Sequence, residues 1–163
     1  MGNYQDLEYE FIERTIALIN QYYASLDQYP FEKQYNYTLT INCLLGLIVM
    51  PKERALTYLP KLPINNNLKA SIGLNETEFG GHISNLKTLI QSLRHSIAHF
   101  NIDVISEGDE QLIDWVEFTD SEHGHRLVAR FRAKELLPFL KFYTESLLNN
   151  LKQYRNSKHQ PRD

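Results

Sequence analysis

The sequence predicts a mainly α-helical fold: a bundle of about four main helices with a small antiparallel β-hairpin or sheet inserted before the last helix. Two observations predict it. Apolar residues recur every three or four positions over most of the 163-residue chain, which is the period of a helix with one buried face. Between residues 102 and 132 the period changes to two, as in half-buried strands. Helices with one apolar face bury it by packing together.

The first part of the chain is predicted to form two long helices. Apolar residues at helical spacing predict the first helix from residue 4 to about residue 28, and Pro30 follows it. The same spacing restarts over residues 31–50. Because this segment is apolar nearly all round after Ile41, its helix should be the most buried of the set.

The middle of the chain is predicted to form a short helix, a loop and a third long helix. Pro51 can begin a helical turn over residues 52–59, because its missing N–H would be unpaired there in any case. Prolines and asparagines then predict a loop over residues 60–67. A helix follows over residues 82–100. Because two glycines precede it, the sequence does not fix the residue at which this helix begins.

The segment after this helix is predicted to be a hairpin or three-stranded meander. Alternating apolar residues indicate strands over residues 102–106, 112–119 and 126–132, with turns between them. Helical spacing returns over residues 133–154. Pro138 falls in the first turns of this last helix, where it can mark the true start.

Composition places the chain among single-domain globular proteins. With 42% hydrophobic and 12% aromatic residues it can bury its own core, and we expect one domain over residues 1–154 and a polar tail over residues 155–163. The net charge of −3 argues against binding of nucleic acid by bulk charge. The single cysteine, Cys43, excludes an internal disulfide framework and a zinc site built on several thiolates.

A cytoplasmic location is expected from the same composition. The first ten residues carry acidic side chains and no basic segment, so no secretory signal is predicted. The longest apolar run, residues 43–50, is far shorter than the roughly 20 residues that cross a bilayer. A lone cysteine is also typical of a reducing compartment.

The sequence lacks common nucleotide-binding and hydrolase motifs. Gly80 and Gly81 are adjacent, but they have neither the preceding strand nor the following Lys-Ser/Thr of a phosphate-binding loop. No G-x-S-x-G segment marks a serine nucleophile. The many carboxylates between residues 103 and 122 are expected in turns and on exposed strand faces.

The helix that ends near residue 100 carries a second, polar stripe. On a helical wheel this stripe contains Thr88, Ser92, His95 and His99, and Arg94 lies at the other margin of the polar side. Histidine can transfer a proton near neutral pH, and the guanidinium of arginine suits phosphate. These are the two groups that phosphodiester cleavage requires when no metal ion takes part.

The segment Arg94-His95-Ser96-Ile97-Ala98-His99 resembles the signature motif of the HEPN superfamily, in which an Arg and a polar residue precede a His near the end of a helix. The predicted hairpin before the last helix is similar to a HEPN subgroup of plasmid and bacterial proteins. The resemblance implies a HEPN-like helical bundle and a homodimer whose facing motif helices form one cleft. It also implies a metal-independent endoribonuclease, so neither a metal ion nor another cofactor is expected.

The resemblance assigns roles to the motif residues. His99 would act as the acid and base in attack by the ribose 2′-OH, Arg94 would stabilise the charge on the phosphoryl group, and His95 would orient the site. Many relatives are toxins or antiviral factors, so RNA and an antitoxin are the implied partners. In the HEPN toxins that pair with a minimal nucleotidyltransferase antitoxin, a Tyr stands two residues beyond the motif His. Here that position is Asn101, so silencing by modification of that Tyr is not supported.

Other interpretations of the motif remain open. The chain could be a catalytically inactive HEPN-like module that binds a partner protein or nucleic acid. Arg94 could be a surface arginine paired with an acid, and His99 could only cap its helix. The spacing of His95 and His99 also suits a shared metal ion, with a third ligand from elsewhere such as His82.

The last part of the chain is basic, with nine Lys and Arg against two acids from residue 126 to residue 162, whereas residues 103–122 contain eight acids and no Lys or Arg. The arginines of the last strand share strand parity, which predicts one face that could follow a phosphate backbone. Ion pairs with Asp114 and Glu117 are the alternative. His123 and His125 are expected to be exposed turn residues. The candidate substrate-binding residues are Ser92, Asn101, Arg126, Arg130 and Arg132.

Overall fold

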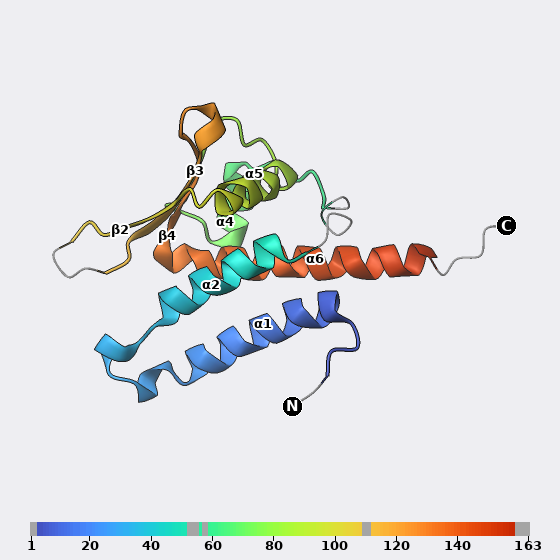
Figure 1. Cartoon of the computed structure of the whole chain (residues 1–163), viewed down its shortest axis with the longest axis horizontal. Helices are drawn as coiled ribbons and strands as arrows, with labels where there is room; N and C mark the ends of the chain where they lie inside the picture. Colours follow the sequence, from blue (N-terminus) through green and yellow to red (C-terminus); the bar gives the residue numbers. More distant parts are fainter. Residues whose placement is uncertain (1–2, 52–55, 57–58, 109–111, 159–163) are drawn as a thin grey trace. The chain divides into compact units, whose positions relative to one another are not determined.

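The computed structural model describes residues 3–51, 56, 59–108 and 112–158, with residues 154–158 described by their backbone alone (Figure 1). The chain is 58% helical with a small antiparallel sheet, which confirms the predicted mainly α class. It divides into two compact units. The helical unit is Met1–Leu59 with Lys141–Asp163, and the mixed unit is Pro60–Leu140. Among the described residues, no helix combines the length and the apolar character needed to span a membrane.

The helical unit contains α1 (Leu7–Ala24), α2 (Asn36–Val49) and most of α6 (Leu136–Lys158). Both early helices are shorter than predicted. Residues 26–28 and 31–33 form separate 3-10 turns on either side of Pro30, because proline cannot continue a helix through its missing N–H. The predicted short helix over residues 52–59 lies mostly outside the described residues.

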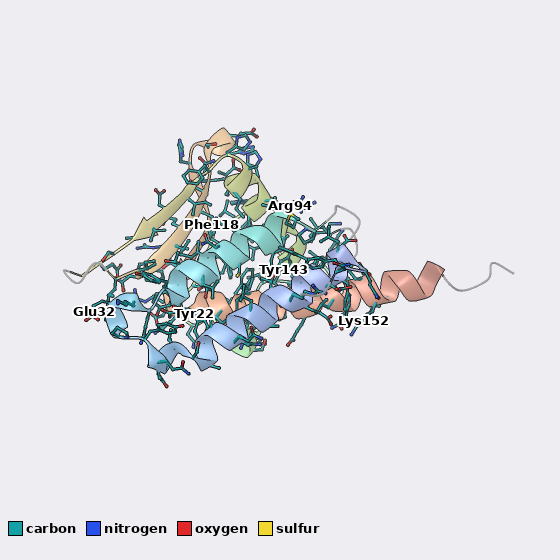
Figure 2. The ribbon with its side chains drawn as sticks, turned by 60° about the horizontal axis from the view of Figure 1, so that its bottom comes forward. Tyr22, Glu32, Arg94, Phe118, Tyr143 and Lys152 are labelled. Carbon is teal, nitrogen blue, oxygen red and sulfur yellow. The ribbon has the colours of Figure 1, made fainter. Side chains whose placement is uncertain are left out.

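Buried apolar side chains join the helices of this unit. Tyr143 of α6 is fully buried, and its hydroxyl donates a 3.4 Å hydrogen bond to the carbonyl of Leu47 in α2 (Figure 2). The carboxylate of Asp6 caps α1 by accepting from the N–H of Tyr9. The fully buried residues that α1 and α2 contribute are Ile12, Ile19, Leu44, Leu47 and Ile48.

The mixed unit packs helix α5 on one face of a four-stranded antiparallel sheet (Figure 1). The strands are β1 (Glu78–Phe79), β2 (Ile102–Ile105), β3 (Trp115–Asp120) and β4 (Arg126–Arg132), in the order β1-β4-β3-β2. The predicted meander is present. Strand β1 was not predicted, because two residues are too few to show a period, and it comes from before α5 (Leu86–Ala98).

The predicted loop over residues 60–67 is partly helical. Helix α4 (Asn66–Ile72) begins inside it, because the side chain of Asn65 accepts from the N–H of Leu68 and so caps a helix start. The run of asparagines was therefore a helix cap as well as a turn signal.

The core of the mixed unit lies between α5 and the sheet. Phe118 of β3 and Phe131 of β4 are fully buried, with ring centroids 6.1 Å apart (Figure 2 labels Phe118). The Oγ of Ser96, a buried residue of α5, donates to the carbonyl of Thr119 at 2.7 Å. This hydrogen bond ties the last turn of α5 to the end of β3. The buried residues of α5 on this side are Leu86, Leu89, Ile90 and Leu93.

A buried carboxylate fixes the segment that leads into β1. Glu135, in the 3-10 turn before α6, is 3% exposed and accepts from the backbone N–H groups of Asn75, Glu76 and Thr77 and from the Thr77 hydroxyl. Burial alone would raise the pKa of Glu135, but the hydrogen bonds from Thr77 and its neighbours outweigh burial and lower that pKa.

Candidate functional site

The motif helix ends at His99 in a tight, hydrogen-bonded turn. His99 is the C-cap of α5, the N–H of Phe100 donates to the carbonyl of Ile97, and the N–H of Asn101 donates to that of Ser96. This is the pattern of a Schellman motif, whose left-handed position is usually glycine. Here it is Phe100, with φ of 56° and a side chain that is 83% exposed. The turn presents His99 at the surface.

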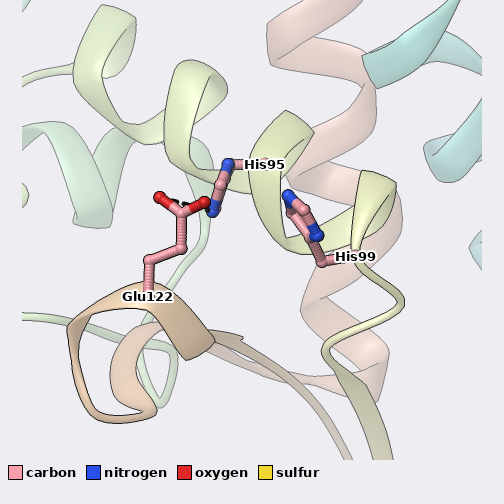
Figure 3. A group of neighbouring side chains, drawn as sticks. All are labelled: His95, His99 and Glu122. Atoms are coloured by element: carbon pink, nitrogen blue, oxygen red, sulfur yellow. Dashed lines mark ion pairs between the residues drawn. The ribbon is translucent and has the colours of Figure 1, made fainter.

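The two motif histidines lie side by side at this end of α5. Their ring centroids are 4.5 Å apart, because residues four positions apart in a helix share a face (Figure 3). The side chain of His95 is 33% exposed, yet its Nε2 atom is buried and has no hydrogen-bond partner among the described residues. The predicted pairing of the two histidines on one face is present.

Two carboxylates face His95 from the turn between β3 and β4. The Oε2 of Glu122 lies 3.6 Å from the Nε2 of His95, and the Oδ1 of Asp120 lies 3.8 Å from the same atom (Figure 3 shows Glu122). Both distances are longer than a hydrogen bond. The 3-10 turn at residues 121–123 places Glu122 over α5, and the side chain of Asp120 accepts from the N–H of Glu122.

Asp120 is held by two basic side chains. Its Oδ2 accepts from Nδ1 of His123 at 2.8 Å and from Arg126 at 3.1 Å. Burial would raise the pKa of Asp120, but these hydrogen bonds outweigh it and lower that pKa. His123 is exposed, as predicted for a turn residue, but it is also an ion-pair partner. His125 is exposed with φ of 56°.

A shallow hollow of about 240 Å³ lies between α5 and this turn. The predicted polar stripe contributes Thr88, Ser92 and His95 to its lining, and His99 is the next residue along the stripe. The sequence did not identify Asp120 or Glu122 as part of this site, because their approach to α5 depends on the packing of the β3–β4 turn. The lining is Thr88, Gln91, Ser92, His95, Asp120, Glu122 and His123.

Arg94 is half-buried on α5 and is not among the residues that line the hollow. Five helical positions separate Arg94 from His99, which rotates one side chain from the other by about 140°. Within one copy of the chain, the two motif residues therefore leave α5 in different directions.

The other predicted substrate contacts do not converge on the hollow. Asn101 donates from Nδ2 to the hydroxyl of Ser121 at 2.8 Å. Arg130 and Arg132 stack on Trp115, with guanidinium carbons 4.6 and 4.8 Å from its ring centroid. Their guanidinium groups also pair with nearby carboxylates, those of Glu76, Glu107, Asp114 and Glu117.

The prediction that all three arginines of β4 share one face is wrong for Arg126, whereas Arg130 and Arg132 do share a face. Arg130 pairs across the ladder with Glu117, whereas Arg126 pairs with Asp120, and a bulge lies between these two pairs. Directly paired residues of neighbouring strands point to the same face. One extra residue in β4 reverses its alternation, so Arg126 lies on the α5 side and Arg130 on the opposite side.

Three side chains could together hold a metal ion, and they differ from the predicted set. Among the described residues, His95, His99 and Glu122 place one ligand atom each within 4.8 Å of one another (Figure 3). His82, the suggested third ligand, is not in this group. Burial and the positive charge of Arg126 lower the pKa of His82.

Comparison with known proteins identifies the family. No curated protein and no solved structure matches the chain at a significant level. The sequence model of one family, described as HEPN pEK499 p136, matches residues 1–154, which include all of the elements above except the last residues of α6. The match covers the motif helix, the sheet and the buried cores of both units. The chain therefore belongs to the HEPN pEK499 p136 family, and with it to the HEPN superfamily.

Proposed function

We propose that this protein is a metal-independent endoribonuclease that acts as a homodimer. The observation that carries the proposal is the family motif itself, Arg94-His95 followed by His99, at the exposed end of α5 with its two imidazole rings 4.5 Å apart. An imidazole at the surface beside a polar hollow can reach a bound phosphodiester. Arg94, from the same helix, supplies permanent positive charge.

The proposed reaction is transesterification within the RNA strand. His99 accepts the proton of a ribose 2′-OH as the 2′ oxygen attacks phosphorus, and the bond from phosphorus to the 5′ oxygen breaks. A proton from a histidine neutralises the leaving 5′ oxygen. Arg94 stabilises the charge on the phosphoryl oxygens, and His95 orients the substrate. The products are a 2′,3′-cyclic phosphate and a 5′-hydroxyl.

A homodimer can bring Arg94 and His99 to the same site, which a single copy of α5 does not do. Arg94 and His99 diverge by about 140° on α5, so a two-fold axis that passes between these two directions can bring Arg94 of each copy to the motif of the other. HEPN domains commonly dimerise. Light scattering at micromolar concentration should therefore give twice the 19.1 kDa chain mass. A species of 19.1 kDa alone at that concentration would contradict the dimer.

Such an activity fits a cytoplasmic toxin or defence factor that is restrained by an antitoxin protein. Support comes from the superfamily, in which these roles are common, and from the absence of any need for a cofactor in the proposed reaction. The Asn at position 101 argues for restraint by binding rather than by modification of a Tyr at that position.

Cleavage of a single-stranded RNA in EDTA tests the proposal. The full chain should cut RNA and leave an all-DNA strand of the same sequence intact, because DNA lacks the attacking 2′-OH. His99→Ala should abolish cutting, and His125→Asn is the matched control, since it removes an exposed imidazole outside the hollow. Cutting that survives His99→Ala, or that requires a divalent ion, would overturn the mechanism. RNA binding without cutting by the intact chain would favour the alternative, an inactive binding module.

A further inference from the structure

We propose that His95, His99 and Glu122 form a binding site for Zn²⁺ or a similar divalent metal ion. We further propose that the bound ion inhibits RNA cleavage at the proposed ribonuclease site. Binding of the ion is independent of the proposed function, whereas the inhibition rests on it. The three side chains come from α5 and from the β3–β4 turn, two segments that only the fold brings together (Figure 3).

The spacing of the ligand atoms suits one ion. Ligand bonds of about 2.1 Å at tetrahedral angles put neighbouring ligand atoms about 3.4 Å apart. The Nε2 of His95 and the Oε2 of Glu122 are 3.6 Å apart, and all three ligand atoms lie within 4.8 Å of one another. Separations larger than this must shrink, by up to about 1.4 Å, when an ion binds. Glu122, with 60% of its side chain exposed, and the exposed His99 have room to make that movement.

The state of His95 favours an ion over a direct contact. Its Nε2 atom is buried and has no hydrogen bond among the described residues, although two carboxylates lie just beyond hydrogen-bond distance. A buried polar atom without a partner costs free energy, and an ion between Nε2 and Glu122 would remove that cost. Asp120 already accepts hydrogen bonds from His123 and Arg126, so it would not be a ligand of the ion.

The donor set indicates the class of ion. Two imidazoles and one carboxylate are the ligands of many zinc sites that keep a fourth position open. Imidazole nitrogen suits Zn²⁺ and its transition-metal neighbours, whereas Mg²⁺ and Ca²⁺ prefer oxygen ligands. We therefore expect selection of Zn²⁺ over Mg²⁺ at this site.

An ion bound here would stop the proposed reaction through His99. A metal-bound ring nitrogen has no lone pair left to accept the proton of a 2′-OH, so the histidine cannot serve as the base. The same three side chains would thus be active without the ion and inactive with it.

Zinc titration of the metal-free full chain, in competition with a chromogenic chelator, tests the site without any measurement of activity. We expect one Zn²⁺ per chain and no competition from Mg²⁺. Glu122→Gln and His95→Ala should each weaken binding more than about tenfold, since loss even of groups behind the ligands costs about that much. His125→Asn should bind as the unaltered chain does. Equal zinc affinity in Glu122→Gln and the unaltered chain, or an equal loss in His125→Asn, would overturn the site.

Imidazole nuclear magnetic resonance of the unaltered chain gives a second test that does not depend on the variants. Zinc should shift the ring signals of His95 and His99 and leave those of His125 in place; shifts confined to other histidines would overturn the site. Inhibition is then measured on RNA. If the chain never cuts RNA but binds zinc at this site, the proposed function fails and the site stands. If it cuts RNA at full rate with the site saturated, the proposed inhibition is wrong.

Discussion

Two polar surfaces of the mixed unit hold the same kinds of side chain in different ways. On the face of the sheet away from α5, Arg130 and Arg132 stack on Trp115 and pair with surrounding carboxylates. At the end of α5, the Nε2 of His95 faces two carboxylates at 3.6 and 3.8 Å without a hydrogen bond. The Nε of Arg130 likewise has no hydrogen bond among the described residues, and it lies 3.7 Å from the Oε2 of Glu117. The two surfaces differ in the kind of cation: the first pairs permanent guanidinium charges with carboxylates, whereas the second holds titratable imidazoles beside a hollow.

This difference indicates that the Arg130 and Arg132 face serves stability, whereas the end of α5 is the candidate active site. Because Arg130 and Arg132 lie beside four carboxylates, this face of the sheet presents little net positive charge to RNA. Each pair contributes little to stability when it is solvent-exposed. A histidine beside an open hollow, next to a second histidine, can instead serve a substrate or an ion. The face of the sheet that carries Arg130 and Arg132 therefore offers less to an RNA strand than the end of α5 does.

The largest expected effect is on the rate of RNA cleavage, when a motif residue of α5 is replaced. Arg94→Ala should lower the rate of RNA cleavage by about 10² to 10³, the cost of losing one group that stabilises charge in a transition state. Single-turnover kinetics at saturating RNA measures it. Because the proposed role is charge stabilisation, Arg94→Lys should restore part of the rate; an unchanged rate in Arg94→Ala would remove Arg94 from the mechanism.

A smaller effect, on stability, is expected at Glu135, whose carboxylate holds the segment before β1. Glu135→Gln should lower the free energy of unfolding by about 2 to 4 kcal/mol, because a neutral amide replaces a buried carboxylate that accepts from four donors. Urea denaturation measures this loss.

The same carboxylate predicts a pH dependence. The pKa of Glu135 is lowered in the folded state, so its contribution to stability is present above the ordinary value of 4.5 and is lost as the pH falls through the lowered value. Glu135→Gln should therefore flatten this part of the acid unfolding curve. If the curve of the variant matches that of the unaltered chain, the carboxylate is not the cause.

A gain of stability is expected at the end of α5. Phe100→Gly should raise the free energy of unfolding by about 1 kcal/mol or less, because glycine adopts the left-handed position without strain while the exposed ring loses few contacts. Thermal denaturation measures it, with Phe100→Ala as the control that keeps a Cβ and hence the strain. A less stable Phe100→Gly would mean that the ring has contacts worth more than the strain.

The smallest effect is expected on the far face of the sheet. Arg130→Ala should lower the free energy of unfolding by about 1 kcal/mol, since two half-exposed ion pairs and a cation–π contact each contribute only about a third to a half of a kcal/mol at such sites. High salt should reduce the difference between the two proteins, because it screens the pairs with Glu107 and Glu117. A loss of several kcal/mol would show that the comparison of the two surfaces is wrong.

The sequence predicts those parts of the structure that depend on neighbours along the chain. The period of 3.6 predicted the helices, the period of two predicted β4 at its observed residues, and helical geometry predicted that His95 and His99 share a face. The differences lie at helix ends. Residues 26–28 and 31–33 form 3-10 turns instead of continuing the first two helices, and Asn65 caps a helix inside a predicted loop.

By itself, the sequence determined the helical class, the place of the strands of the meander and the motif on α5, because each depends on spacing within a short segment. Only the tertiary structure decided that β1 joins the edge of the sheet, that a bulge moves Arg126 to the α5 side, and that Glu122 faces His95. These features arise when distant segments pair, and a one-residue shift in strand register reverses every side chain beyond it. No local period records such a shift, so the site could be completed only from the folded chain.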